Sequence, residues 1–278
     1  MTQSHAATFT AALVQMRSGR SVDANVAAAV ELIREAAGRG AHYVQTPEVT
    51  TLMEIDRDRL FAAAVPEAGN PALATFTDLA AKHKIYLHIG SMGVRSGDRI
   101  ANRSYVIAPS GEIIARYDKI HMFDVSLANG ETYKESASYA PGGVAVIASL
   151  PWGKLGLTIC YDLRFPALHQ ALVHGGATML AIPAAFTRPT GEAHWHTLVR
   201  ARAIETQCFV FAAAQGGKHE HGRETYGHSL IVSPWGTVLA EGGTEPGVIT
   251  AQIDMAEVPA IRTRIPALAN ARAFDLQR

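Results

Sequence analysis

Cysteine is the residue in this sequence best suited to nucleophilic chemistry, and it occurs only as Cys160 and Cys208. Cys160 ends the apolar run 155–159 and precedes a helix start signalled by Pro166. A cysteine in such a strand-to-helix turn lies near backbone N–H groups and a helix dipole, which favour the thiolate. We therefore interpret Cys160 as a candidate nucleophile, although a buried structural role is commoner for a cysteine. Cys208 enters the apolar run 209–214 and is interpreted as such a structural residue.

Two charged residues stand in positions comparable to that of Cys160. Glu48 follows Pro47 at the end of a short predicted strand, and Lys119 follows another strand within residues 116–121. Taken singly, each is an ordinary solvated charge. All three residues, however, lie just past the ends of predicted strands, where open α/β sheets usually build their sites. A thiol, a carboxylate and an ammonium group together are suited to acyl transfer through a covalent thioester.

The first hundred residues alternate between strand and helix patterns. Strands are predicted at 11–14, 42–45 and 85–89, where short apolar runs end at Gly, Pro or polar residues. Helices are predicted after the N-cap candidate Ser21 and over about 70–84. The order of elements is therefore strand, helix, strand, helix, strand.

One segment of the sequence occurs twice in similar form. Residues 104–115 (SYVIAPSGEIIA) align without gaps onto residues 229–240 (SLIVSPWGTVLA). Each copy has two apolar runs around a turn that contains Pro and Gly, which is the pattern of a β-hairpin. A weak internal repeat of this kind predicts two similar sheets.

The residues between and around these hairpins complete the prediction. Strands are expected at 144–147, 155–159, 179–182 and 209–212, and helices at about 165–174 and 192–207. Strands this apolar need cover on both faces. Two sheets packed on each other with helices outside satisfy that need. Because no linker or low-complexity tract interrupts the chain, we predict a single α/β domain over residues 1–278.

The composition excludes several partner classes. Lys and Arg together number 25, as do Asp and Glu, so no global field favours nucleic acid or an anionic membrane. The N-terminus has no basic region, and its apolar stretches are too short for a signal peptide or a spanning helix. We expect a cytoplasmic protein. Two isolated cysteines also argue against a disulfide scaffold.

Two histidine pairs require a test for metal binding. His194 and His196 lie two residues apart on a predicted helix and do not share a face. His219 and His221 lie in a polar segment without a nearby thiolate. We therefore predict no metal site. No histidine is singled out as a partner of Cys160, although a Cys-His hydrolase stays open on composition.

Three segments resemble the signature segments of the nitrilase, or carbon-nitrogen hydrolase, superfamily. They are 46–48 (TPE), 117–121 (YDKIH) and 159–166 (ICYDLRFP), and the similarity extends over about 10–273. The resemblance implies a four-layer α-β-β-α sandwich that forms homodimers or higher homo-oligomers. This agrees with the two predicted sheets. Thr46 stands where the family usually has Leu, a departure that leaves the glutamate unaffected.

The resemblance also implies roles for individual residues. Cys160 would be the nucleophile, Glu48 the general base, and Lys119 the oxyanion stabiliser together with the backbone N–H of Tyr161. Glu135 matches a second family glutamate, which is expected to hold Lys119 and help position the substrate. The chemistry requires a desolvated site that raises the pKa of Glu48 toward neutrality. Water then hydrolyses the thioester, so neither a metal nor an organic cofactor is expected.

Segments 191–195, 200–208 and 226–229, together with 234–236, resemble the branch that includes deaminated-glutathione amidases. This branch similarity implies hydrolysis of the amide that joins a 2-oxoglutarate unit to cysteinylglycine, a small-molecule substrate. An omega-amidase acting on 2-oxoglutaramate shares the acyl half and is the alternative. A catalytically silent binding subunit and an acyltransferase are further alternatives.

Four residues are candidates for the substrate pocket. Arg164 is suited to bidentate pairing with a substrate carboxylate, but it also has Asp162 nearby as a partner for a structural ion pair. Phe186 and Thr187 follow the strand predicted at 179–182, and we expect them to line the pocket together with His194.

Overall fold

The computed structural model describes residues 8–127 and 130–277. One sheet has the spatial order β17-β1-β2-β3-β4-β5, with β8 paired to β4. Its strands are β1 (Thr8–Gln15), β2 (Tyr43–Gln45), β3 (Tyr86–Ser96), β4 (Arg99–Ile107), β5 (Ile113–Asp118), β8 (Tyr139–Ala140) and β17 (Gly247–Asp254). Strands β1, β2 and β3 run parallel, whereas β4 and β5 form an antiparallel hairpin beside β3.

The second large sheet has the spatial order β16-β15-β12-β11-β10-β9. Its strands are β9 (Val146–Leu150), β10 (Gly153–Leu157), β11 (Met179–Ala181), β12 (Phe209–Ala212), β15 (Leu230–Val232) and β16 (Val238–Glu241). Strands β10, β11 and β12 run parallel, β15 and β16 are antiparallel, and β9 is antiparallel to β10.

The two sheets share one topology. In each, three parallel strands are followed by an antiparallel hairpin, and one antiparallel strand flanks the first of the three. The repeated segments 104–115 and 229–240 fall on the equivalent hairpins β4-β5 and β15-β16. The internal repeat predicted from the sequence therefore corresponds to two similar sheets.

Strand β1 shows why the sheets are buried on both faces. Its residues Phe9 and Leu13 belong to the core between the sheets, while Val14 packs into a second core beneath helices. Phe9 and Tyr43 of the first sheet contact the ring of Phe211 in the second, with ring centroids 6.3 and 5.1 Å apart. Alternate side chains of one strand thus fill two different cores.

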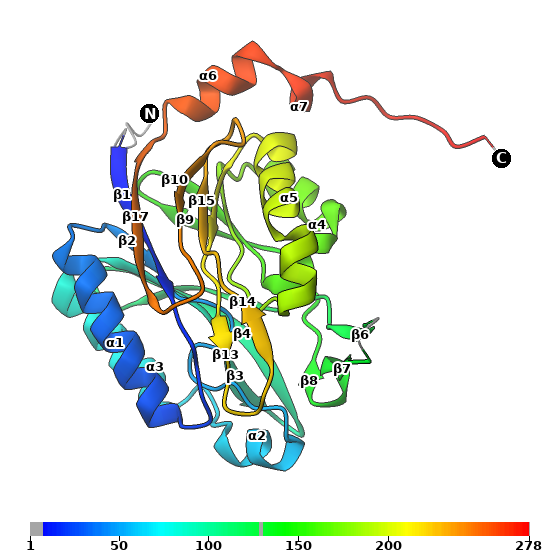
Figure 1. Cartoon of the computed structure of the whole chain (residues 1–278). Helices are drawn as coiled ribbons and strands as arrows, with labels where there is room; N and C mark the ends of the chain where they lie inside the picture. The colour runs from blue at the N-terminus through cyan, green and yellow to red at the C-terminus, as the bar shows by residue number, and fades with distance from the viewer. Residues whose placement is uncertain (1–7, 128–129, 278) are drawn as a thin grey trace.

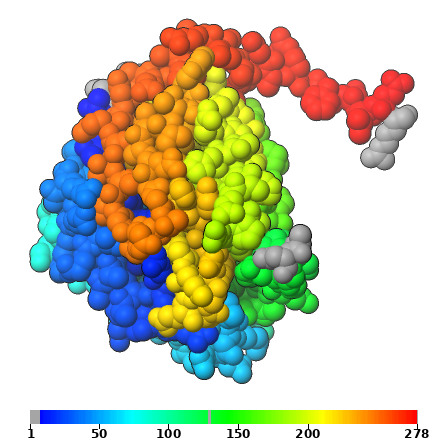
Figure 2. Space-filling view, viewed as in Figure 1, coloured from blue at the N-terminus to red at the C-terminus, as the bar shows by residue number. Residues whose placement is uncertain are grey.

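Helices cover the outer faces of both sheets (Figure 1). Helices α1 (Val22–Gly38) and α3 (Pro71–His83) pack on the first sheet, and α4 (Pro166–His174) and α5 (Arg188–Thr206) pack on the second. This arrangement confirms the four-layer α-β-β-α sandwich. Helices α6 (Glu257–Arg264) and α7 (Ala267–Asn270) run across one end, and the following tail extends away from the body (Figure 2).

Local signals explain most helix starts. The Ser21 side chain accepts a hydrogen bond from the Ala24 N–H, and Asn70 caps α3 in the same way. Helix α5, however, begins at Arg188 rather than at residue 192. Pro189 lies in its first turn, a start signal that the sequence prediction did not use.

Short elements at one end of the sandwich were not predicted. They are helix α2 (Arg57–Ala63), the hairpin of β6 (Asp124–Ser126) and β7 (Thr132–Lys134), the hairpin of β13 (Gly216–Lys218) and β14 (Glu224–Tyr226), and the 3-10 helices η1 (Glu135–Ala137) and η2 (Cys160–Arg164). Several of them surround the site described below. Across the described ranges, no helix is both long enough and apolar enough to cross a membrane.

Candidate active site

Glu48 lies in a tight turn directly after β2 and is only 5% exposed. The next residue, Val49, has a φ of 50°, a conformation that β-branched residues rarely adopt. Its N–H donates to the Ser91 hydroxyl over 2.9 Å. Gly90 allows the close approach of this turn, because a Cβ at that position would lie 2.5 Å from the Pro47 carbonyl oxygen. The surrounding backbone therefore fixes the direction of the Glu48 side chain.

Lys119 follows β5 and forms ion pairs with two carboxylates. Its Nζ lies 2.8 Å from Glu48 Oε1 and 2.8 Å from Glu135 Oε2, and the residue is 2% exposed. Asn102 of β4 donates through Nδ2 to Glu48 and to Glu135, each over 3.1 Å. Glu135 also accepts the Phe123 N–H over 2.7 Å. The predicted proximity of Glu48, Lys119 and Glu135 is thus present in the structure.

Cys160 follows β10 and opens η2 with a φ of 50°. Its N–H donates to the Pro183 carbonyl over 2.8 Å, which ties the turn to the end of β11. The thiol contacts the Glu48 carboxylate, and the Ala185 N–H donates to the sulfur. Among the described residues the Tyr161 N–H has no hydrogen-bond partner, so it can donate to a ligand.

The pKa shifts of Cys160 and Glu48 run opposite to those expected from the sequence. Burial raises the pKa of the Cys160 thiol well above its ordinary value, and the Glu48 carboxylate raises it further. Burial also disfavours the Glu48 carboxylate, but the Lys119 ammonium and the Cys160 hydrogen bond bring the Glu48 pKa below its ordinary value. For Lys119, the attraction of Glu135 and Glu48 overcomes burial and raises the pKa. The expected thiolate at Cys160 and the expected raised pKa of Glu48 were therefore wrong.

Asp162 connects the segment that carries Lys119 to the turn that carries Cys160. Its carboxylate accepts the Tyr117 hydroxyl over 2.6 Å. The backbone N–H and the ring Nδ1 of His121 lie 3.0 and 2.6 Å from it. Asp162 is fully buried, and these partners replace the structural ion pair with Arg164 considered from the sequence.

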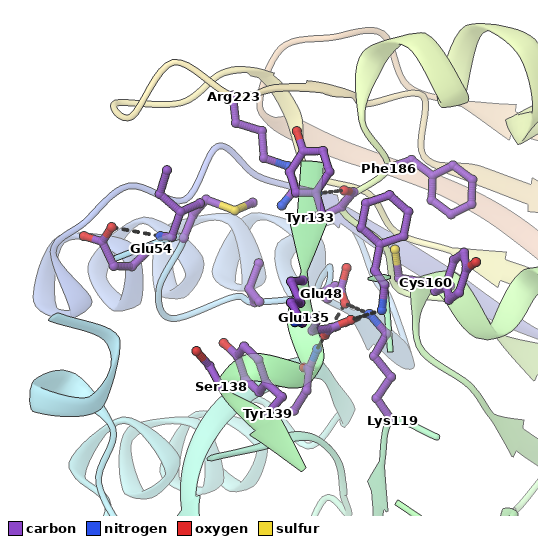
Figure 3. Close-up of a pocket in the computed structure, with 18 of the residues that line it drawn as sticks. Glu48, Glu54, Lys119, Tyr133, Glu135, Ser138, Tyr139, Cys160, Phe186 and Arg223 are labelled. Atoms are coloured by element: carbon purple, nitrogen blue, oxygen red, sulfur yellow. Dashed lines mark hydrogen bonds and ion pairs between the residues drawn. The ribbon is translucent and has the colours of Figure 1, made fainter. Parts of the chain in front are cut away.

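A cavity of about 260 Å³ opens over these residues. Figure 3 shows Glu48, Lys119, Glu135 and Cys160 close together, with Tyr133, Phe186 and Arg223 on the side above them. A thiol, a carboxylate and an ammonium group facing one small cavity can support nucleophilic attack on a carbonyl carbon.

The candidate pocket residues divide into two groups. Arg164 and Phe186 line the cavity, and the Arg164 guanidinium lies 5.3 Å from the centroid of the Phe186 ring. Thr187 does not line it, because this buried residue directs its hydroxyl to Thr190, 2.8 Å away. His194 also lies outside the lining, since it is on the exposed face of α5 and contacts Arg164 there. The expected pocket roles of Thr187 and His194 are corrected accordingly.

Sequence reasoning missed two residues of this site. Asn102 lies in β4, where Arg99, Arg103 and Ser104 are polar as well, so its residue type alone did not distinguish it. Arg223 lies in the turn between β13 and β14 and reaches the cavity from a distant part of the chain. No local pattern distinguishes it from a surface arginine.

A histidine cluster lies outside the cavity lining. His196 Nε2 and His228 Nδ1 each lie 2.9 Å from Glu241 Oε1, and these ligand atoms all lie within 4.8 Å of one another. Hydrogen bonds between the rings and the carboxylate account for this arrangement. His194 is not part of the cluster, and His219 is instead bonded to the Ser18 carbonyl.

The fold and this cavity define a cysteine-containing hydrolase of the four-layer sandwich class. The family model described as carbon-nitrogen hydrolase matches residues 10–263. The deaminated glutathione amidase of Yersinia enterocolitica is 38% identical over 94% of this chain and 92% of its own length. That of Bos taurus is 40% identical over 94% of this chain and 81% of its own length.

Solved structures give the same result. The C. elegans NitFhit protein superposes with a TM-score of 0.89 and 34% identity, over 96% of this chain and 66% of that chain. Saccharomyces cerevisiae Nit3, a member of branch 10 of the nitrilase superfamily, superposes with a TM-score of 0.85 and 28% identity, over 94% of this chain and 96% of that chain. The chain belongs to the carbon-nitrogen hydrolase family of the nitrilase superfamily and is an amidase.

Proposed function

We propose that this amidase hydrolyses deaminated glutathione to 2-oxoglutarate and cysteinylglycine. The observation that carries the proposal is a pair of arginines in the cavity lining. Lys119 pairs with both Glu48 and Glu135, whereas Arg164 and Arg223 line the cavity without a carboxylate partner among the described residues. Two guanidinium groups that lack a carboxylate partner suit a substrate with two carboxylates. The names of the relatives from Yersinia enterocolitica and Bos taurus point to the same substrate.

The proposed nucleophile is Cys160, with Glu48 as its base. Because the resting thiol is neutral, its proton must pass to Glu48 as the sulfur attacks the amide carbon. Glu48 then gives this proton to the departing amine, and cysteinylglycine leaves behind a thioester on Cys160. In the second half, Glu48 takes a proton from water, the resulting hydroxide attacks the thioester, and 2-oxoglutarate leaves as the Cys160 thiol is restored.

The tetrahedral intermediates need donors for their oxyanion. We assign this role to the Lys119 ammonium and the Tyr161 N–H, which has no partner of its own in the described chain. One such donor contributes roughly 3 kcal/mol to the stability of the transition state. Glu135 and Asn102 hold Lys119 in place, since both belong to its hydrogen-bond network.

Three broader proposals accompany this function. We propose that residues 1–278 form one domain, supported by a core that both sheets share. A cytoplasmic location is supported by two buried cysteines that form no disulfide. A homodimer or higher homo-oligomer is supported by the apolar side chains of Ile204 and Trp235, which are 51% and 50% exposed on the outer helical side. Light scattering after size-exclusion chromatography tests the last proposal.

The function is tested by release of 2-oxoglutarate from deaminated glutathione and from 2-oxoglutaramate, with wild-type protein and Cys160→Ala. Faster wild-type turnover of deaminated glutathione, lost in the variant, is the expected result. Preference for 2-oxoglutaramate would instead identify an omega-amidase. Transfer of the acyl group to an added primary amine, at the expense of the acid, would identify an acyltransferase. No turnover of either compound would contradict the proposed substrate and reopen the case for a silent binding subunit.

A further inference from the structure

Arg223 is one of the two cavity arginines that suit a substrate carboxylate, and the structure indicates which carboxylate it takes. It lies in the turn between β13 and β14, far in sequence from Glu48 and Lys119, yet it lines the same cavity. Its charge acts on the Glu48 carboxylate, which shows that the two groups lie in one electrostatic environment. Figure 3 shows its guanidinium end beside Tyr133, on the side of the cavity above Glu48.

The contacts of Arg223 hold the guanidinium group without neutralising it. Nη2 donates to the Ala185 carbonyl over 2.6 Å, and Cζ lies 5.0 Å from the centroid of the Tyr133 ring. Its Nε is buried without a hydrogen-bond partner in the described part of the chain. A buried donor that lacks a partner is costly unless a ligand satisfies it.

Arginines outside the cavity are held in two ways. Arg99 and Arg262 resemble Arg223, because they contact backbone carbonyls and have a buried Nε without a partner in the described part of the chain, but neither lines the cavity. Others are held by carboxylates. Arg103 forms two hydrogen bonds with the Asp118 carboxylate, over 2.6 and 2.9 Å, and a third with Glu67. Arg188, in the neighbouring region, pairs with Glu192 and Glu224. Across residues 8–127 and 130–277, no carboxylate pairs with Arg223. Because Arg223, unlike Arg99 and Arg262, lines the cavity, a ligand carboxylate can supply its missing partner.

The position of Ala185 indicates which part of the substrate carries that carboxylate. The Ala185 N–H donates to the Cys160 sulfur, while its carbonyl accepts the Arg223 guanidinium. The backbone N–H and carbonyl of Ala185 thus contact the Cys160 sulfur and the Arg223 guanidinium, respectively, so these two groups lie near the same residue. The acyl group stays bound to the sulfur through the thioester, so a carboxylate on this group stays in the part of the cavity around the sulfur during both halves of the reaction. Arg164, the other arginine of the cavity lining, instead contacts the exposed His194.

We propose that Arg223 is the specificity-determining residue that binds the carboxylate of the acyl half of the substrate. The proposal rests on the proposed function in that it takes a 2-oxo acid as the acyl group. Arg223 pairs with this carboxylate through its fork of N–H donors, and Tyr133 stacks against the guanidinium to hold it. The arginine thereby selects amides of dicarboxylic acids over neutral aliphatic amides.

The experiment compares three substrates in wild-type protein, Arg223→Gln and Arg223→Lys. Deaminated glutathione and 2-oxoglutaramate carry the acyl carboxylate, whereas 4-oxopentanamide has a methyl group in its place. We expect Arg223→Gln to lower kcat/KM about 100-fold for the first two, mainly through KM, because one charged hydrogen-bonded pair is lost. Turnover of 4-oxopentanamide should stay within about twofold. Arg223→Lys should retain part of the selectivity, since it keeps the charge but not the fork.

Arg188→Gln is the matched control, because Arg188 is a nearby arginine that pairs with Glu192 and Glu224 and does not line this cavity. It should leave all three substrates unchanged. An equal loss on all three substrates in Arg223→Gln would show a structural role and overturn the proposal. A loss confined to deaminated glutathione would place the glycine carboxylate at Arg223 and would also overturn it.

A second readout does not depend on turnover. 2-Oxoglutarate should protect Cys160 from alkylation by iodoacetamide in wild-type protein, and this protection should be lost in Arg223→Gln. If the wild type hydrolyses neither proposed substrate but shows this protection, the proposed function fails while the carboxylate site stands. If turnover is present and protection is equal in both proteins, the carboxylate site fails while the function stands.

Discussion

The two cysteines occupy opposite ends of the parallel strands in the second sheet. Cys160 follows β10 at the carboxyl end, whereas Cys208 precedes β12 at the amino end. Both are buried, and burial raises the pKa of both thiols. Burial alone therefore does not distinguish a reactive cysteine from a structural one.

Their partners differ instead. The Cys208 sulfur donates to the carbonyls of Ala177 and Thr206 over 3.4 and 3.3 Å, which leaves it no base. The Cys160 sulfur faces Glu48, and Cys160 opens a turn with positive φ beside the cavity. The comparison teaches that the carboxylate partner and access to the cavity make one thiol chemically useful.

The largest expected effect is that of Cys160→Ala. Without its sulfur no thioester can form, and kcat/KM for the amide substrate should fall at least about 10⁴-fold. Release of 2-oxoglutarate measures the loss. The thermal unfolding midpoint should stay close to that of the wild type, because the thiol is replaced by a smaller apolar group. If Cys160→Ala kept activity within tenfold of the wild type, Cys160 would not be the nucleophile, and its assignment as the reactive cysteine would be wrong.

Glu48→Gln should lower kcat/KM by roughly 10³-fold, because the base is lost. The same substitution should move the titration of Cys160 to lower pH, since the Glu48 carboxylate raises the pKa of this thiol and the amide does not. The rate of iodoacetamide alkylation measured against pH tests the direction. Glu54→Gln is the control, because Glu54 lines the same cavity but pairs with Arg20. An unchanged or upward shift in Glu48→Gln would contradict the assigned pairing.

These two predictions concern residues that were expected at strand ends from the sequence and that follow strands in the structure. Glu48, Lys119 and Cys160 all follow strands, and strand ends are visible as breaks in short apolar runs. The repeated hairpin segment likewise predicted two similar sheets, because the two apolar runs around a turn specify a β-hairpin in each copy. The four-layer arrangement could also be predicted, since strands that are apolar on both faces must be covered on both faces.

Other properties of the site depend on contacts between distant segments. Arg223 reaches the cavity only because its turn packs against Ala185, and no spacing in the sequence records that contact. The protonation of Cys160 and Glu48 was mispredicted for the same reason. Local features near Cys160 favour a thiolate, but burial and the Glu48 carboxylate from the other sheet outweigh them.

A smaller effect is expected from Asp162→Asn. This change keeps the size of the side chain but weakens the hydrogen bonds from Tyr117 and His121, so Cys160 and Lys119 lose their shared support. A displacement on the order of 1 Å can lower kcat about 100-fold, and we expect a loss of 10- to 100-fold with KM nearly unchanged. Steady-state kinetics separate the two constants.

The control for that position is Asp118→Asn, which breaks the pair with Arg103 on the same segment without touching the Cys160 turn. It should lower stability but not kcat per folded molecule. If both variants reduce kcat in proportion to their loss of folded protein, Asp162 has only a structural role. A selective loss of kcat in Asp162→Asn would show that the second sheet positions Lys119 as well as Cys160.

The smallest effect on activity is expected from the substitution of Cys208. Cys208→Ala should leave kcat and KM within about twofold of the wild type, because no step of the mechanism uses this thiol. It should lower the free energy of unfolding by about 1 kcal/mol, since a small buried group and its weak hydrogen bonds are lost. Urea denaturation and turnover on the same preparation measure both quantities. A loss of activity without a loss of stability would show that Cys208, at the amino end of the sheet, also takes part in the reaction. The assignment of Cys208 as a purely structural residue would then be wrong.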